Sequence, residues 1–417
     1  MTRPEPSRPE PSRTEFILLI ASIMMIVAFG IDAMLPALPA IGRSLNVADP
    51  TDWSLVITVF TIGFGIAQLF AGPLSDRFGR KRLLVGSLAV NAAFNIVAAF
   101  SGSFIALLAA RFASGFGAAG ARVLVTAVVR DRFAGRDMAQ VMSLAAAVFM
   151  AAPILAPFMG TAVLLVAPWP WIFVVLAGLS AALFVWTWRR LPETLAVEKR
   201  IPLERHALLA AARIVLTDRQ SVGYTIANTA FTVAIMGFLT SVQLVFAQTL
   251  GRPDLLPWGF AVMAGVMMVA SLVNSRIVMI WGMRRIGHWA LIAFTAVAAF
   301  HTVFASVATE TLWSFVALQS LMMIGFSLAV GNFGALGMER MGGVAGMASS
   351  LQGAVGSILG SLGGALIGQS FDGSTVPLYT GITLAGLVAL AAVVWAEGGR
   401  LFVVRSVAPA AETVEAA

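Results

Sequence analysis

Long apolar runs, each separated from the next by a short polar joint, dominate the pattern of this sequence. Most of them are close to the ~20 residues that a helix needs to cross the hydrocarbon core of a bilayer. Helices satisfy their own backbone hydrogen bonds, so the pattern indicates an all-α integral membrane protein. We expect about twelve transmembrane helices, at residues 16–38, 53–73, 83–103, 105–128, 140–164, 170–188, 222–249, 257–279, 287–308, 311–335, 343–368 and 377–396.

Composition agrees with a membrane protein. Of the 417 residues, 59% are hydrophobic and 11% are charged, and a soluble domain of this size needs more charge to keep its surface hydrated. The net charge of +7 does not indicate a nucleic-acid partner, because the basic residues form short clusters between the spans. The chain has no cysteine and three scattered histidines, so we expect neither thiol chemistry nor a metal site.

The basic residues mark one side of the membrane. They gather in alternate loops, whereas the other loops hold little beyond Arg43 and Arg252. The positive-inside rule places the basic loops in the cytoplasm, and an even number of spans places both termini there too. We therefore expect a multi-pass protein of the inner (plasma) membrane with a disordered cytosolic tail at 1–15 and a second tail at 401–417. The basic loops hold Arg77, Arg80, Lys81, Arg82, Arg130, Arg132, Arg136, Arg189, Arg190, Lys199, Arg200, Arg205, Arg284 and Arg285.

One polar stretch inside the chain, residues 189–221, is long enough to be a linker. It separates an N-terminal six-helix bundle at 16–188 from a C-terminal one at 222–400. The halves share a faint repeat, since FGRKR ends the second span and WGMRR, Trp281–Arg285, ends the eighth. Two pseudo-symmetric six-helix halves with a binding site between them form a large class of transporters.

The segment GPLSDRFGRKR, Gly72–Arg82, carries a family signal. It resembles the signature between spans two and three of the major facilitator superfamily. Further segments resemble the bicyclomycin-resistance (Bcr/CflA) branch of its drug:proton antiporters. Two positions depart from that branch: Ala33 and Met34 follow Asp32 where a tyrosine is common, and Thr126 stands near the place of a second arginine. The further segments are FGIDAMLPALP, RFASGFGAAG, VVRDRF, AAPILAPFMG, WRRLPETL and FDGSTVP.

The resemblance implies that the charged loop gates the cytoplasmic side. Asp76 would interact with the positive N-terminus of span eleven, and Arg80 would pair with Asp131 at the end of span four. Together they would latch the two halves shut. The alternative is that the basic residues only anchor the loop at the membrane surface. The remaining residues of this motif are Gly72, Arg77 and Gly79.

Asp32 is the main candidate for proton coupling. It lies about 24 Å along the first span, where a carboxylate must face a cavity, pair with a cation or hold a proton. Arg111 in span four reaches a similar depth and is its expected partner; the family motif also associates an arginine here with proton exchange. The alternative is a fixed pair that only joins spans one and four. Arg122, on the same face as Arg111, is either a cavity cation or an arginine that extends to the interface.

Small residues and prolines predict close helix packing. In span eleven a glycine recurs every four residues, and we expect this ridge to face span two across the two halves. Ordinary packing and dimerisation are the alternatives. Prolines in span five remove backbone hydrogen bonds and kink the helix, and the resemblance associates this region with antiport. The residues concerned are Gly356, Gly360 and Gly364 in the ridge, and Pro153, Pro157 and Gly160 in span five.

Polar and adaptable apolar side chains within the spans are candidates for the cavity lining. Methionine and aromatic side chains suit varied ligands. The alternative for each is simple packing or a lipid-facing position. The candidates are Asn228, Thr232, Gln319, Asn332, Phe149 and Met150.

These features predict a secondary active transporter that exports small amphipathic, drug-like compounds across the inner membrane in exchange for protons, by alternating access. The alternative is a proton-coupled transporter of the same fold for a specific metabolite. We expect no enzyme and no catalytic residues, because no motif brings acids, bases and nucleophiles together. No Walker loop is present, so we expect the proton gradient, without a cofactor, to supply the energy. The expected partners are a small-molecule substrate, protons and the lipid bilayer, with no nucleic acid, and we expect a monomer.

Overall fold

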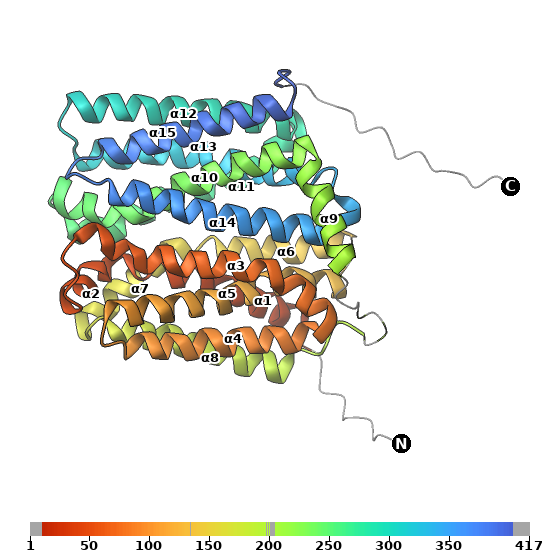
Figure 1. Cartoon of the computed structure of the whole chain (residues 1–417). Coiled ribbons are helices and arrows are strands. Elements are labelled where there is room, and N and C mark those ends of the chain that lie inside the picture. Colours follow the sequence, from red (N-terminus) through yellow and green to blue (C-terminus); the bar gives the residue numbers. More distant parts are fainter. Residues whose placement is uncertain (1–10, 134, 197, 199, 201–204, 403–417) are drawn as a thin grey trace.

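The computed structural model describes residues 11–402, apart from 134, 197, 199 and 201–204. Within these residues the chain is helical and contains no β-strand. The helices run side by side in two stacked bundles, with the first half of the chain below the second in Figure 1. The short helix α9 (Arg205–Thr217) lies at one end of the bundles and α2 (Leu38–Ser44) at the other. We call these the α9 end and the α2 end. The described chain begins and ends at the α9 end.

The N-terminal half holds the first helices of the chain. Short 3-10 turns, η1 (Leu35–Ala37) and η2 (Pro50–Ser54), flank α2 at the α2 end. The long helices are α1 (Arg13–Asp32), α3 (Leu55–Phe78), α4 (Arg80–Ala99), α5 (Phe104–Arg132), α6 (Gly135–Phe149), α7 (Ala152–Val166) and α8 (Pro170–Arg190).

The C-terminal half repeats this arrangement after α9. Three short turns, η4 (Val245–Thr249), η5 (Pro253–Leu255) and η6 (Gly342–Val344), join its helices. The long helices are α10 (Arg219–Leu244), α11 (Leu256–Trp281), α12 (Met283–Val307), α13 (Leu312–Met338), α14 (Ala345–Gln369) and α15 (Val376–Ala396).

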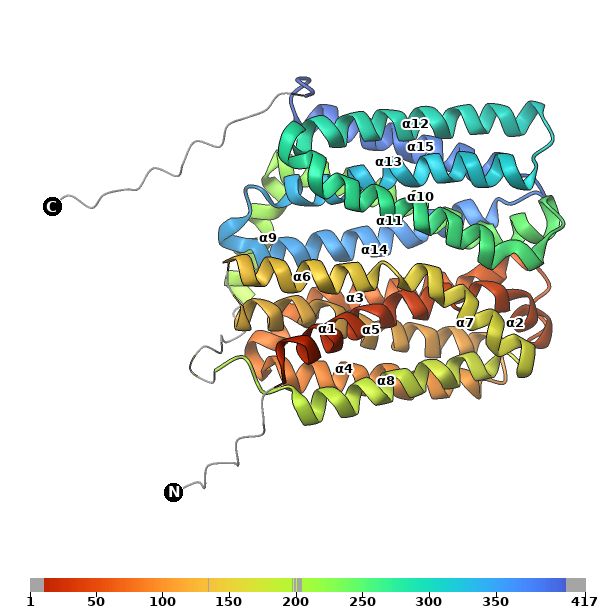
Figure 2. The ribbon, with the colours of Figure 1, turned by 180° about the vertical axis from the view of Figure 1, so that it is seen from behind.

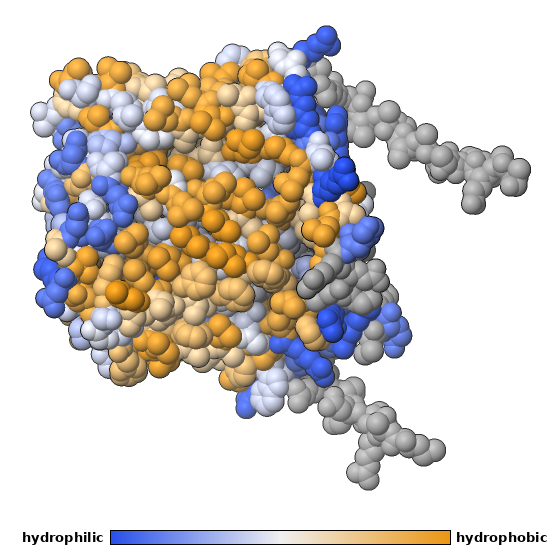
Figure 3. Space-filling model, in the orientation of Figure 1, coloured by the Kyte–Doolittle hydropathy of each residue, from blue (hydrophilic) through white to orange (hydrophobic). Residues whose placement is uncertain are grey.

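The predicted spans are confirmed with one difference. Among the described residues, 11 helices are long and apolar enough to cross a membrane. The predicted fifth span is divided into α6 and α7, which follow one another along the bundle (Figure 2). The break falls just before Pro153, whose ring nitrogen cannot donate to the preceding turn. On the face shown in Figure 3, apolar side chains cover the middle of the molecule and polar side chains gather at its two ends. The chain is therefore a multi-pass membrane protein.

Helices extend into two segments that were predicted to lie outside the spans. The first helix begins at Arg13, inside the predicted tail, because the Ser12 hydroxyl accepts a hydrogen bond from the Glu15 N–H (3.2 Å) and Arg190 pairs with the Glu15 carboxylate (2.6 Å). The predicted linker contains helix α9, which packs its Val215 against Met341 and Ala348 near the start of α14. The rest of the predicted tails, residues 1–10 and 403–417, lies outside the described residues.

The glycine ridge of α14 packs inside the C-terminal half. A Cβ at Gly360 would lie 2.4 Å from Thr232, and one at Gly364 would lie 2.3 Å from Met236, both on α10. The expectation that this ridge faces the second span is wrong, because helical spacing shows which residues share a face and not which neighbour they meet. The contact with α3 uses another face of α14, where Gln68 Nε2 donates to the Gly353 carbonyl (3.3 Å) and to Ser357 Oγ (3.0 Å).

We expect Gly360→Ala to destabilise the protein and Gly356→Ala to leave it nearly unchanged. The added methyl at Gly360 must displace Thr232, which is an overpacking of about 1–3 kcal/mol. At Gly356 the nearest atoms of α10 are 3.9 Å away, an ordinary contact. The measurement is the thermal unfolding midpoint of each purified variant in detergent. Equal midpoints for the two variants would show that the ridge is not closely packed.

Candidate functional site

Asp32 lies at the point where α1 ends inside the membrane. The helix stops at Asp32, and Pro36 follows within the next turn, η1. The side chain is buried, with 5% of the residue exposed. It lines a cavity of about 140 Å³ between the two halves, opposite Phe238 and Phe260 of the C-terminal half. Asp32 therefore faces a space inside the protein and not the lipid.

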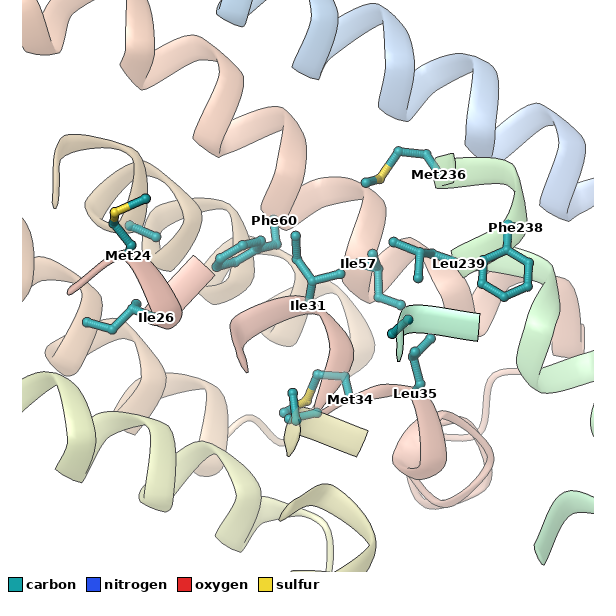
Figure 4. Packing of buried hydrophobic residues seen from close by; sticks show 14 of the residues in the cluster. Met24, Ile26, Ile31, Met34, Leu35, Ile57, Phe60, Met236, Phe238 and Leu239 are labelled. Carbon is teal, nitrogen blue, oxygen red and sulfur yellow. The ribbon is translucent and has the colours of Figure 1, made fainter. Parts of the chain in front are cut away.

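The walls of this cavity are apolar. Pro153 of α7 lies beside Asp32 on the N-terminal side. Figure 4 shows Ile31 and Ile57 of the N-terminal half and Leu239 of α10 in the same apolar layer. Asp32 is the one ionisable side chain among the described residues that line the cavity. The other lining residues are Ile235, Phe238, Leu239, Phe260, Met263, Ala264, Met267, Met323 and Phe326.

The Asp32 carboxylate forms no hydrogen bond or ion pair within the described part of the chain. The predicted pair with Arg111 is wrong. Arg111 is fully buried, and its Nη2 and Nε donate to the backbone carbonyls of Gly30 (2.6 Å) and Val56 (3.1 Å). Its guanidinium also lies over the Phe60 ring, 4.2 Å from the centroid. The last carbonyls of a helix lack intrahelical partners and carry partial negative charge, so the end of α1 takes the place of the expected carboxylate.

Arg122 lies further along α5 and has a different environment. The side chain is partly buried, and its guanidinium lies over the Phe149 ring of α6, 5.6 Å from the centroid. The structure thus brings together Arg122 and Phe149, both of which were predicted as site residues. Neither of them lines the cavity beside Asp32.

The other predicted lining residues form polar contacts within the C-terminal half. Thr232 donates to the Asn228 carbonyl (2.9 Å), Gln319 accepts from Tyr379 (3.1 Å), and Asn332 donates to Asn274 (3.1 Å). None of them lines the described cavity, nor does Met150. The phenylalanine and methionine side chains that do so were missed, because such residues are common on every helix of this chain.

The residues of the span-five motif lie against the end of α1. Pro153 lines the cavity, and Pro157 lies inside α7, where Thr161 bonds back to its carbonyl (3.0 Å). At Gly160 a Cβ would lie 2.1 Å from the carbonyl oxygen of Ala33. Only glycine allows α7 to approach the chain so closely here, so this motif positions the turn that carries Asp32.

The charged loop between α3 and α4 forms an ion cluster at the α9 end. The predicted pair of Arg80 and Asp131 is confirmed, with Nε and Oδ2 3.2 Å apart. Arg80 also pairs with Asp76 (2.6 Å) and bonds to Ser75. The predicted interaction of Asp76 with the start of α14 stays a prediction, although Gly72, one turn earlier, lies against Ser350 of α14.

Glu193, in the segment after α8, completes this cluster and was missed. Its carboxylate accepts from the backbone N–H groups of Arg80 (2.8 Å) and Lys81 (3.4 Å), so it caps the N-terminus of α4. Gly79 joins α3 to α4 with φ +100°, where a Cβ would also meet this carboxylate. The acid is far from the loop in sequence, and no spacing rule connects them.

The C-terminal half repeats the turn and its charges. Gly282 joins α11 to α12 with φ +77°. Arg284 pairs with Glu339 (2.6 Å) and Glu397 (2.9 Å), and Tyr224 donates to Glu397 (2.7 Å). Partial burial acts to raise the pKa of Glu339, but hydrogen bonds from Arg284 and Gln220 outweigh it and hold the pKa below its ordinary value.

Comparisons with known proteins agree with this architecture. Residues 20–365 match the Major Facilitator Superfamily. A bicyclomycin resistance protein homolog of Haemophilus influenzae is 32% identical over 83% of this chain and 88% of its own length. The MFS-type transporter YdgK of Bacillus subtilis is 30% identical over 88% of this chain and 91% of its own length. The multidrug resistance protein MdtL of Escherichia coli is 30% identical over 43% of this chain and 46% of its own length.

A solved structure supports the fold. The human organic anion transporter MFSD10 (TETRAN) superimposes with a TM-score of 0.65 and 18% identity, over 93% of this chain and 100% of the other. At this identity the likeness concerns the fold alone. The family match, the relatives and the two stacked helical bundles lead to one conclusion. The chain belongs to the major facilitator superfamily, and it is a membrane transporter and not an enzyme.

Proposed function

We propose that this transporter exports small amphipathic compounds across the inner membrane in exchange for protons, with the α9 end in the cytoplasm. The observation that carries the proposal is the buried Asp32 carboxyl, which has no partner within the described residues and faces an apolar cavity between the halves. The relatives named for resistance to bicyclomycin and to multiple drugs support an exporter. The orientation is supported by the basic residues Arg77, Arg80 and Arg82 at the α9 end.

In this proposal, proton exchange results from a change in the surroundings of the Asp32 carboxyl, which favour its protonated form at one stage and its ionised form at another. In an apolar cavity an ionised carboxylate without a cation is costly, so the group holds a proton while the cavity is closed. Water or a bound substrate with a cationic or donor group stabilises the carboxylate and releases the proton. The acid then carries either a proton or substrate across in each half-cycle. Arg111 positions the end of α1 in this scheme and is not the counter-ion.

The cavity lining favours amphipathic compounds over a specific polar metabolite. Apart from Asp32, the described lining side chains are apolar, and methionine and phenylalanine predominate among them. Methionine adapts to ligands of different shape. A polar metabolite would need several fixed hydrogen-bonding groups, because polar groups left unpaired on binding weaken affinity. We propose that no cofactor takes part and that one chain is sufficient.

We propose that the Arg80 cluster controls opening at the α9 end. Arg80 holds the end of α3 to α4 and α5 through Asp76 and Asp131, and the same end of α3 contacts α14 at Ser350. A rigid α3 terminus gives α14 a fixed surface when the halves close. Loss of Arg80 would loosen that surface without removing a span.

We expect Asp32→Asn to abolish transport driven by a proton gradient while substrate-for-substrate exchange continues. Asparagine keeps the shape of the side chain but cannot release a proton. The measurement is uptake of a fluorescent cationic dye into inverted membrane vesicles with an acidic interior, compared with dye counterflow without a gradient. Asp254→Asn, which changes an exposed acid in the η5 turn, is the control. Gradient-driven uptake by Asp32→Asn at the native rate would contradict proton coupling through Asp32. Absence of acid-driven uptake by the native protein would contradict antiport.

We expect Arg80→Ala to reduce transport strongly and Arg82→Ala to leave it nearly unchanged. Both variants remove one positive charge from the same loop, so they weaken its topological signal equally. Arg80 pairs with two acids, whereas Arg82 is exposed. The measurement is vesicle transport divided by the amount of protein in the membrane. If the two variants transport equally well, the loop acts only as an anchor.

A further inference from the structure

A second, larger cavity lies inside the N-terminal half. Its volume is about 460 Å³, and it is enclosed by α1, α4, α7 and α8. No residue lines both this cavity and the one beside Asp32. In Figure 2, α1, α7 and α8 lie on the near face of this half, with α4 behind them. The volume falls within the range of small-molecule sites, ~300–1,000 Å³.

The mouth of this cavity faces the lipid. Met25 and Phe29 of α1 line it and are half-buried, and Leu179 of α8 lines it and is 43% exposed. These side chains belong to the outer surface of the bundle, away from the seam between α3 and α14. A molecule dissolved in the bilayer can therefore enter from the side.

The inner wall of the cavity carries a polar cluster between α4, α5 and α8. Asn91 Nδ2 donates to the Ser114 carbonyl (2.7 Å), and Ser180 Oγ donates to Asn91 Oδ1 (2.7 Å). The amide nitrogen of Asn95 donates to the carbonyl oxygen (2.9 Å) and the side-chain oxygen (3.1 Å) of Asn91. These two acceptors, both on Asn91, fix which side of the Asn95 amide carries the nitrogen and which carries the oxygen.

The remaining oxygen of Asn95 has no donor. Asn95 is 2% exposed, and its Oδ1 is buried without a hydrogen-bond partner in the described structure. A buried acceptor left in this state is costly. Ser22 of α1 also lines the cavity, and no hydrogen bond of its hydroxyl is found among the described residues. The cavity thus combines apolar walls with an acceptor that lacks a donor.

We infer that this cavity binds small amphipathic molecules from the bilayer, each with an elongated apolar body and a hydroxyl or N–H group that donates to Asn95. Asn95 lies one turn before the end of α4 at Ala99, about 6 Å along the helix at 1.5 Å per residue. A phosphatidylcholine has neither an O–H nor an N–H group, so at any depth it would leave the acceptor unmatched. The chemistry therefore favours a small alcohol, phenol or amide.

An occupant would also touch the turn of α1 that carries Asp32. Gly30 lines this cavity, and its carbonyl accepts the hydrogen bond from Arg111. The second site is consequently in contact with the helix end that positions the proposed proton carrier. Binding itself does not depend on the proposed transport function.

The test uses a photoreactive long-chain alkanol with a diazirine in its chain and, as a control probe, its methyl ether, which cannot donate. The full-length protein is labelled in phosphatidylcholine vesicles, and the modified peptides are identified by mass spectrometry. We expect the alkanol to label peptides of α1, α4 and α8. The ether should label them about 2- to 10-fold less, the effect of one hydrogen bond.

Two matched variants locate the site. Val175→Trp fills the cavity, because Val175 lines it, whereas Val185→Trp adds the same bulk on the lipid-facing side of α8. We expect the first to remove most alkanol labelling and the second to preserve it. Asn95→Leu should make the alkanol and the ether equivalent, and if that variant does not fold, the Val175 and Val185 pair decides. Equal labelling by the two probes, or labelling insensitive to Val175→Trp, would overturn the inference.

A further arm distinguishes a lipid chain from a free small molecule. A phosphatidylcholine with a diazirine in its acyl chain replaces the alkanol. If a free molecule is the occupant, this lipid labels exposed surfaces broadly, and Val175→Trp has no effect on its labelling pattern. Lipid labelling concentrated in the cavity, lost in Val175→Trp and not displaced by decanol, would show that an acyl chain is the occupant and would refute the hydrogen-bonded ligand.

Discussion

The burial of the Arg111 guanidinium is the constraint on which the N-terminal half depends. A cation without water must be met by oxygen atoms, and the nearest ones are the carbonyls of Gly30 in α1 and Val56 in α3. The Phe60 ring covers the guanidinium. One side chain of α5 therefore fixes the end of α1 against α3. Because Nε and Nη2 of Arg111 donate to backbone oxygens and not to Asp32, the Asp32 carboxyl faces the cavity without a cation beside it.

The same turn closes each half at the α9 end, and it depends on charge in both. Gly79 and Gly282 adopt a positive φ that other residues rarely tolerate. Arg80 follows Gly79 directly, and Arg284 is the second residue after Gly282. In the N-terminal half Arg80 is held by Asp76 and Asp131. In the C-terminal half Glu339 and Glu397 hold Arg284. Each cluster stays within its own half, so it stiffens a bundle without joining the two.

The sequence predicts the parts of this architecture that depend on local pattern. Apolar runs locate the spans, and the repeat of FGRKR and WGMRR identifies two turns of the same shape. The resemblance to a family adds the pair of Arg80 and Asp131. Contacts that depend on tertiary distance were missed or wrong: the cap that Glu193 provides for α4, and the packing of Gly360 on α10. Every residue carries a backbone carbonyl, so residue types could not show which carbonyls accept hydrogen bonds from Arg111.

Under the proposed alternating access, the contacts between the halves are the ones that must open. Inside the C-terminal half, glycines bring α14 so close to α10 that a Cβ at Gly364 has no room. Between the halves, the described contacts include the bonds of Gln68 to α14 and, near the α2 end, an edge-to-face pair of Phe158 and Trp258. The seam is closely packed as well, since a Cβ at Gly65 of α3 would lie 2.7 Å from the Ile358 side chain of α14. In the proposed transport cycle the two bundles rock against each other along this seam, and Asp32, at the cavity between them, is the ionisable group that the motion would present to one side and then to the other.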